Sequence, residues 1–234
     1  WKAGGTASSN GNGSITSSVS ASTESGFSVV GFTGTGSNAT VGHGLTAAPE
    51  FIILKERDAT DNWSVFVEPL GNTGKLRLNG TNSFITASTS FNNTSPTSTV
   101  FTTGTDGELD GSMIAYCFHS VEGFSKIGTY TGNGNADGAC VFTGFRPAWI
   151  LLKVTSTTGS WKIFDNKRPD PFNVIDARIE VDNAGTEDTN SVFHIDLLSN
   201  GFKLRGSSGE QNGAGSSFIY LAFAEQPFKY ANAR

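Results

Sequence analysis

The chain carries the same sequence blocks twice, and this internal repeat limits its fold more than any other feature. Four blocks of the first half return in the same order, 97 or 98 residues further on. The paired blocks are residues 26–28 with 123–125, 32–36 with 130–134, 49–55 with 147–153, and 63–66 with 161–164. Blocks that recur in one order at near-constant spacing indicate a duplicated folding unit, and a unit of this length is a domain. The repeat therefore predicts two modules in tandem.

We place the first module at residues 26–121 and the second at residues 122–234. Trp1 matches the end of the apolar run that closes each module, so residues 1–25 are expected to hold the end strand of a preceding repeat and a Ser/Gly-rich linker. The linker is rich in Ser, Thr, Gly and Asn and offers too little apolar surface to order itself.

Short runs of apolar and β-branched residues, separated by Gly, Asn, Asp or Pro, predict about six strands in each module. In the first module they are residues 29–32, 51–55, 63–68, 75–78, 99–102 and 113–118, and in the second 126–130, 149–154, 161–164, 192–195, 202–205 and 218–224. A short helix is expected only within residues 188–198. Residues 150–152 and 219–221 are apolar on both faces, which is typical of covered central strands. The predicted fold class is all-β, with two tandem homologous β-sandwich-like modules and little helix.

Composition narrows the class of partner. Charged residues make up 16% of the 234 residues, the formal net charge is −5, and Lys and Arg do not cluster. Nucleic acid is therefore not expected as a partner, because its binding depends on basic side chains. The longest apolar run, residues 218–224, is too short for a membrane helix, so no membrane insertion is expected. Cys117 and Cys140 have no metal or redox spacing, and both are expected to be reduced.

No residue pattern predicts catalysis, a cofactor or a metal centre, and the chain is expected not to be an enzyme. His43, His119 and His194 stand apart in the sequence. Most carboxylates lie in Gly/Asn-rich loops, where Asp is common for conformational reasons. Residues 58–62 and 106–110 hold oxygen ligands suited to calcium, but neither follows an EF-hand or nonapeptide pattern.

Loop aromatic residues are the best candidates for ligand contacts, because sugar rings stack on exposed aromatic side chains. Two loops differ between the modules and carry such residues. The predicted ligand-binding residues are Phe91, Asn92 and Asn93 in the first loop and Asp170, Phe172 and Asn173 in the second. Loops are where a duplicated scaffold acquires a specific site while its cores stay alike.

Several motifs together resemble an uncharacterised repeat domain of bacteriophage tail and fibre proteins, notably those of marine phages. The resemblance rests on residues 1–5, 123–126, 130–134, 144–149, 198–203 and 222–234, and it extends over nearly the whole chain. The family has no catalytic or binding residues to carry over. The resemblance implies a virion component, located in a tail appendage and therefore extracellular.

The favoured function is that of a non-enzymatic tail fibre or adhesin that recognises glycans of the host cell surface. Its expected partners are further copies of itself, as a trimer by analogy with fibres, other tail proteins and the host glycan. One alternative is a purely structural shaft, baseplate or head-fibre module without a ligand. A second is a polysaccharide depolymerase with paired carboxylates from residues 106–110 and 165–170.

Overall fold

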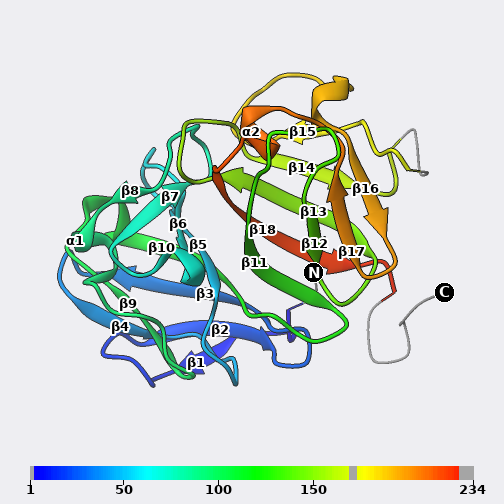
Figure 1. Cartoon of the computed structure of the whole chain (residues 1–234). Helices are drawn as coiled ribbons and strands as arrows, with labels where there is room; N and C mark the ends of the chain where they lie inside the picture. Colours follow the sequence, from blue (N-terminus) through cyan, green and yellow to red (C-terminus); the bar gives the residue numbers. More distant parts are fainter. Residues whose placement is uncertain (1–2, 169–172, 227–234) are drawn as a thin grey trace. The chain divides into compact units, whose positions relative to one another are not determined.

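The structure, a computed structural model, describes residues 3–168 and 173–226. It consists mainly of antiparallel strands with a few single-turn helices, so the all-β fold class is confirmed (Figure 1). The chain divides into two compact units. The first comprises residues 1–78 and 84–120, and the second comprises residues 79–83 and 121–234.

The first unit contains an eight-stranded sheet and a two-stranded sheet. The eight strands are ordered β1-β2-β3-β10-β5-β6-β7-β8, and β4 pairs with β9. Their bounds are β1 Ser8–Asn10, β2 Ser17–Ser22, β3 Phe27–Gly34, β4 Ala39–Gly42, β5 Phe51–Glu56, β6 Ser64–Val67, β7 Gly74–Arg77, β8 Ile85–Thr86, β9 Val100–Thr103 and β10 Gly111–Phe118. Three short helices join them, namely η1 Glu68–Leu70, α1 Ser88–Phe91 and η2 Gly107–Leu109.

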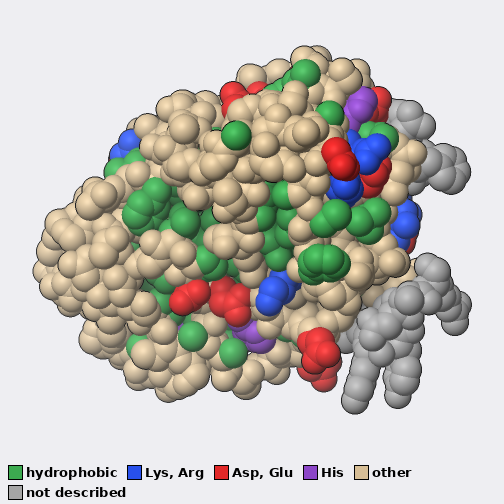
Figure 2. All heavy atoms as spheres, in the orientation of Figure 1, with side chains coloured by type: hydrophobic (Ala, Val, Ile, Leu, Met, Phe, Trp, Pro, Cys, Tyr) green, Lys and Arg blue, Asp and Glu red, His purple; other side chains and the backbone are tan. Residues whose placement is uncertain are grey.

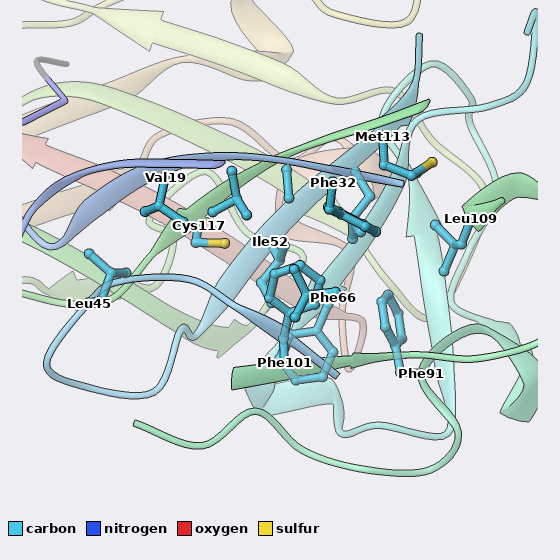
Figure 3. Packing of buried hydrophobic residues seen from close by; sticks show 14 residues of the cluster. Val19, Phe32, Leu45, Ile52, Phe66, Phe91, Phe101, Leu109, Met113 and Cys117 are labelled. Carbon is cyan, nitrogen blue, oxygen red and sulfur yellow. The ribbon is translucent and has the colours of Figure 1, made fainter. Parts of the chain in front are cut away.

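The core of the first unit lies between these two sheets. Val41 of β4 and Phe101 of β9 pack in one buried cluster with residues of the larger sheet. Figure 3 shows Phe32, Phe66 and Phe101 within this cluster, and the rings of Phe32 and Phe101 meet edge to face at 5.8 Å between centroids. The arrangement is that of a sandwich, because each sheet contributes one apolar face to the core.

The second unit contains a five-stranded sheet, β11-β18-β13-β14-β15, and a three-stranded sheet, β12-β17-β16. The bounds are β11 Ser125–Thr131, β12 Cys140–Phe142, β13 Pro147–Val154, β14 Lys162–Asp165, β15 Ile179–Glu180, η3 Ser191–Phe193, β16 Ile195–Leu198, β17 Gly201–Leu204, α2 Gly209–Asn212 and β18 Ser217–Ala224. Val141, Phe202 and Ile195 of the smaller sheet share a buried cluster with Ile150 and Tyr220 of the larger one.

Strand order is the same in the shared parts of the two units. The order β3-β10-β5-β6-β7 in the first corresponds to β11-β18-β13-β14-β15 in the second, and β4-β9 corresponds to β12-β17. This agreement supports the interpretation of the repeat as a duplicated folding unit. Residues 150–152 and 219–221 are buried on both faces of their strands, as predicted.

Two predictions from sequence are wrong here. The segment taken for a linker contributes β1 and β2 to the sheet of the first unit. Val19 of β2 is buried in the core, and Ser17 donates its hydroxyl proton to the Gly42 carbonyl at 2.7 Å. Backbone pairing with β3 orders this polar segment without a large apolar face. The second error concerns the helices. A short helix is predicted only within residues 188–198; the single turn η3 lies there and β16 follows it, but short helical turns also occur as η1, α1, η2 and α2.

Candidate ligand-binding face

The two predicted loops belong to different units, residues 91–93 to the first and Asn173 to the second. Phe91 is only 2% exposed and packs edge to face on Phe66, with ring centroids 5.3 Å apart, so its prediction as an exposed loop aromatic is wrong. The helical turn α1 directs this ring into the core. Asn92 and Asn93 are exposed and follow it with φ of 49° and 47°, a conformation that asparagine tolerates better than most residues.

The second predicted loop is described only in part. Asp170 and Phe172 lie outside the described residues. Asn173 uses its side-chain amide to bond both backbone groups of Leu197, donating to the carbonyl at 3.0 Å and accepting from the N–H at 2.8 Å. These bonds hold the chain beside β16, and the amide of Asn173 is thereby engaged in structure.

A different aromatic residue is exposed. Phe142 is 71% exposed, and the only other exposed large hydrophobic side chain among the described residues is Val192. Phe142 lies on the outward face of the sheet β12-β17-β16, in one row with Gly201 and Leu198. Side chains in such a row share one face of the sheet. Because Gly201 has no side chain, the ring of Phe142 is left without a neighbour on the middle strand.

Gly201 is required at this point by close packing of the backbone. A Cβ atom there would lie 2.0 Å from the carbonyl oxygen of Val141. Only glycine therefore lets β12 and β17 approach in this way. The exposed ring of Phe142 therefore lies opposite the buried backbone of Gly201 and not opposite a side chain.

We call the outward face of the sheet β12-β17-β16 its "outer face". Charged and polar side chains form the next part of this outer face. Lys203 lies between Cys140 and Asp196 in the adjacent row, and its Nζ is 2.6 Å from Asp137. Arg205 pairs with Asp196 at 3.4 Å. Figure 2 shows hydrophobic side chains next to basic and acidic ones over the region where β16 and β17 run in Figure 1.

Residues 133–137 form an exposed loop beside this face, and their own side chains fix its shape. Asn133 accepts a hydrogen bond from the N–H of Asn135 at 3.0 Å, and Asn135 accepts one from Asp137 at 2.9 Å. The Asn133 amide also donates to the Asp137 carbonyl at 3.1 Å. Such turns hold exposed polar groups in fixed positions.

Asn212 anchors the loop from below. Its side chain is completely buried, and its amide nitrogen donates to Asn133 Oδ1 at 3.0 Å, to the Asn135 carbonyl at 2.7 Å and to the Gly206 carbonyl at 3.0 Å. Its Oδ1 accepts from the N–H of Asn133 at 3.0 Å. A buried amide with all these bonds satisfied makes the exposed loop rigid.

The acidic residues of the 106–110 loop serve the first unit internally. Buried Lys75 contacts Asp106 at 2.6 Å and Glu108 at 2.5 Å, and Arg77 contacts Glu108 at 2.5 Å. Ser90 also donates to Asp106 at 2.5 Å. These carboxylates are therefore committed to an ion-pair network, which counts against calcium at this loop and against its use as one half of a depolymerase pair.

The second unit contains a comparable ion-pair network. Buried Lys162 of β14 pairs with Glu210 and with Glu180 of β15, and Arg178 pairs with Asp188 at 2.5 Å. The Arg178 guanidinium also stacks on the ring of Phe193, 3.6 Å from its centroid. Carboxylates of the second unit thus compensate the buried cations Lys162 and Arg178.

Other acidic residues gather in the first unit without forming a metal centre. Burial and the nearby carboxylate of Asp61, with those of Asp58 and Asp110, raise the pKa of Glu56. No group of three or more His, Cys, Asp or Glu side chains suited to a metal ion occurs among residues 3–168 and 173–226. In the same part of the chain, no helix is long and apolar enough to cross a membrane.

His43 has a structural role that makes stability depend on pH. Its buried ring donates from Nε2 to the Thr97 carbonyl at 3.1 Å, since Nδ1 accepts the N–H of Leu45 at 3.1 Å. Burial lowers the pKa of this ring. The unfolded chain therefore binds a proton more readily than the folded one, so stability should fall as the pH drops through about 6.5. Denaturant unfolding between neutral and mildly acidic pH checks this, and a His43→Gln variant with the same pH slope would contradict it.

The two cysteines should differ sharply in reactivity. Burial raises the pKa of the Cys117 thiol to about 12, whereas Cys140 is exposed on β12. We expect a maleimide to label one thiol rapidly in the folded protein, because only a thiolate within reach of the reagent reacts. Cys140→Ser should abolish this rapid labelling and Cys117→Ala should leave it unchanged, as measured by mass spectrometry. Rapid labelling of both thiols in the folded chain would contradict the expectation.

Sequence reasoning missed Phe142 and Asn212 as residues of the candidate site. The alternation through Cys140, Val141 and Phe142 indicates a strand, but a shift of one residue would exchange its two faces. Asn212 gives no local signal for this role, because its partners in the loop, Asn133 and Asn135, lie more than 70 positions earlier in the chain.

Comparisons with known proteins identify a family. No curated protein and no solved structure matches the chain significantly. A family model described as a domain of unknown function (DUF7483) matches residues 1–227 and thus nearly the whole chain. The chain therefore belongs to the DUF7483 family.

Proposed function

We propose that the protein is a non-enzymatic component of a phage tail appendage that binds glycans of the host cell surface through the outer face of β12-β17-β16. The single observation that carries the binding site is the exposed ring of Phe142, on a face that the rigid polar loop reaches through the ion pair of Asp137 with Lys203. The location in a virion rests on the resemblance of the sequence motifs to phage tail and fibre domains.

The chemistry of this face suits a carbohydrate. An aromatic ring offers its π face to the C–H groups of a sugar, and amide and charged groups can bond the hydroxyls. Asn133, Asn135 and Asp137 are held in place before any ligand arrives, so little conformational entropy is lost on binding. A single shallow site of this kind binds weakly, and a homo-oligomer such as a trimer multiplies its effect through avidity.

The test is binding of the purified chain, and of a trimerised fusion, to bacterial cells with and without their surface polysaccharide. Binding that needs the polysaccharide and rises steeply with valency supports the proposal. Phe142→Ala should weaken it at least about tenfold with stability unchanged within about 0.5 kcal/mol, because the ring is exposed. Val192→Ala, which truncates the other exposed hydrophobic side chain, is the matched control.

Two other results would favour the alternative functions. Absence of binding in both forms would favour the architectural alternative, in which the chain is a shaft, baseplate or head-fibre module. Shortening of the polysaccharide during the assay would favour a depolymerase, and the expectation that the chain is not an enzyme would then fall.

A further inference from the structure

No segment within residues 3–168 and 173–226 covers the outward edge of β12, whereas the corresponding edge in the first unit is covered. Val41 of β4 pairs with Phe101, and Val141 of β12 pairs with Phe202, so the two strands occupy matching positions. Both valines are buried. In each strand the residues on either side of the valine direct their backbone groups away from the sheet partner, because hydrogen-bonding direction alternates along an antiparallel strand.

In the first unit, residues 13–17 satisfy these outward groups. The N–H of Ile15 donates to the Thr40 carbonyl at 3.0 Å, and the N–H of Thr40 donates to Ser14 Oγ at 2.9 Å. Ser17 donates its hydroxyl proton to the Gly42 carbonyl at 2.7 Å. Ile15 and Val41 form a parallel bridge, so the covering segment runs in the same direction as β4.

In the second unit the matching groups belong to Cys140 and Phe142. Among residues 3–168 and 173–226, no hydrogen bond reaches the outward backbone groups of these two residues, and both side chains are exposed. The connection before β11 cannot serve, because it is a tight turn in which the N–H groups of Phe124 and Ser125 both bond the Val121 carbonyl at 2.9 Å. An exposed strand edge of this kind is a template for another strand.

We propose that the edge of β12 binds an extended strand of a different protein, running parallel to β12 and carrying serines three residues apart around a β-branched residue. The residue types expected in the partner follow from Ser14, Ile15 and Ser17, which bond or pair with the matching positions of β4. In a second copy of the chain, the segment that makes this fit is already used, since residues 13–17 cover its own β4. Strand addition of this type takes its affinity from main-chain hydrogen bonds.

The side chain of Phe142 limits whether the partner strand can carry a second strand beside it. In the first unit, Gly42 lies under Asn10 of β1, and a Cβ atom at Gly42 would be 2.1 Å from Asn10 Oδ1. Phe142 fills the matching volume in the second unit. The site therefore accepts a single extended strand and excludes a hairpin that returns as β1 does.

The probe for the test is a capped peptide of residues 12–18, titrated into the full chain labelled with 15N. We expect chemical-shift changes centred on residues 140–142. A spin label on the peptide N-terminus should broaden residues 138–140 more than Thr143, because the strands run parallel. Shift changes elsewhere only, or none, would overturn the proposal, as would broadening in the antiparallel pattern.

Variants separate this edge from the glycan site. Cys140→Pro removes one outward N–H and should weaken peptide binding at least about tenfold, while Cys140→Ala keeps that N–H and should bind like the wild type. If Cys140→Pro fails to fold, a peptide methylated at the backbone nitrogen of Ile15 takes its place. This peptide lacks the N–H that would donate to the Cys140 carbonyl, and it should lose binding to the wild-type protein. Equal binding by the methylated peptide would overturn the proposal.

The outcomes for the two proposals differ. Phe142→Ala should weaken glycan binding at least about tenfold and leave peptide binding unchanged. Methylation of the peptide at the nitrogen of Ile15 should instead abolish peptide binding to a chain that still binds the glycan. Self-association of the chain that Cys140→Pro abolishes would make a second copy the occupant and would overturn the assignment to a different protein.

Discussion

Replacing Lys75 by Met is expected to lower the free energy of unfolding by about 3–5 kcal/mol at neutral pH. Lys75 is the buried cation shared by Asp106 and Glu108, whose side chains are only 15% and 14% exposed. Without it, Arg77 is the remaining cation that contacts these two poorly hydrated carboxylates among the described residues, and it contacts only Glu108. Urea unfolding measures the change. Lys203→Met is the control, because its partner Asp137 is 78% exposed and such pairs contribute less than about 1 kcal/mol.

The effect of Lys75→Met should depend on pH. Partial burial alone would raise the pKa of Asp106 and Glu108. The hydrogen bonds and charge of Lys75, together with hydrogen bonds from Ser90 to Asp106 and from Asn62 and Ser64 to Glu108, outweigh burial, and the pKa of each lies below its ordinary value. Such groups stabilise the folded protein above their unfolded pKa and lose this contribution as the pH falls below about 4. The penalty of the substitution should therefore shrink in acid. An equal penalty at neutral and acidic pH would contradict the ion-pair explanation.

Replacing Asn212 by Ala is expected to cost about 2–4 kcal/mol of stability and to release residues 133–137. The substitution leaves the N–H of Asn133 and the carbonyls of Asn135 and Gly206 without their buried partner. Unfolding experiments give the stability, and hydrogen exchange at residues 133–137 reports on the loop.

Asn38→Ala is the matched control for Asn212→Ala. Asn38 is an exposed asparagine in the loop of the first unit that precedes β4, as residues 133–137 precede β12. Its truncation should leave stability within about 0.5 kcal/mol of the wild type. If glycan binding survives Asn212→Ala while hydrogen exchange in the loop rises, the rigid loop is not part of the binding site.

Several strands could be predicted from local sequence because apolar runs and turn residues mark them independently of context. The runs at residues 51–55, 113–118 and 218–224 all correspond to strands in the structure. The strands within residues 8–22 could not be predicted in this way, since a Ser-rich segment becomes a strand only when a neighbouring strand offers backbone hydrogen-bond partners. The short helix predicted within residues 188–198 is limited to the single turn η3, because the residues that follow it pair with β17 as β16.

The sequence by itself determined the all-β class and the order of the repeated blocks, because both depend on local patterns and on similarity along the chain. Only the tertiary structure decided which aromatic ring is exposed. Phe91 and Phe142 both lie near Gly, Asn or Thr residues, yet a helical turn buries the first and an open strand exposes the second. The partners of Lys75 and Asn212 were likewise settled by packing, since each contacts residues more than 30 positions away in sequence. Such contacts cannot be predicted from a local sequence pattern, because their atoms come together only when the chain folds.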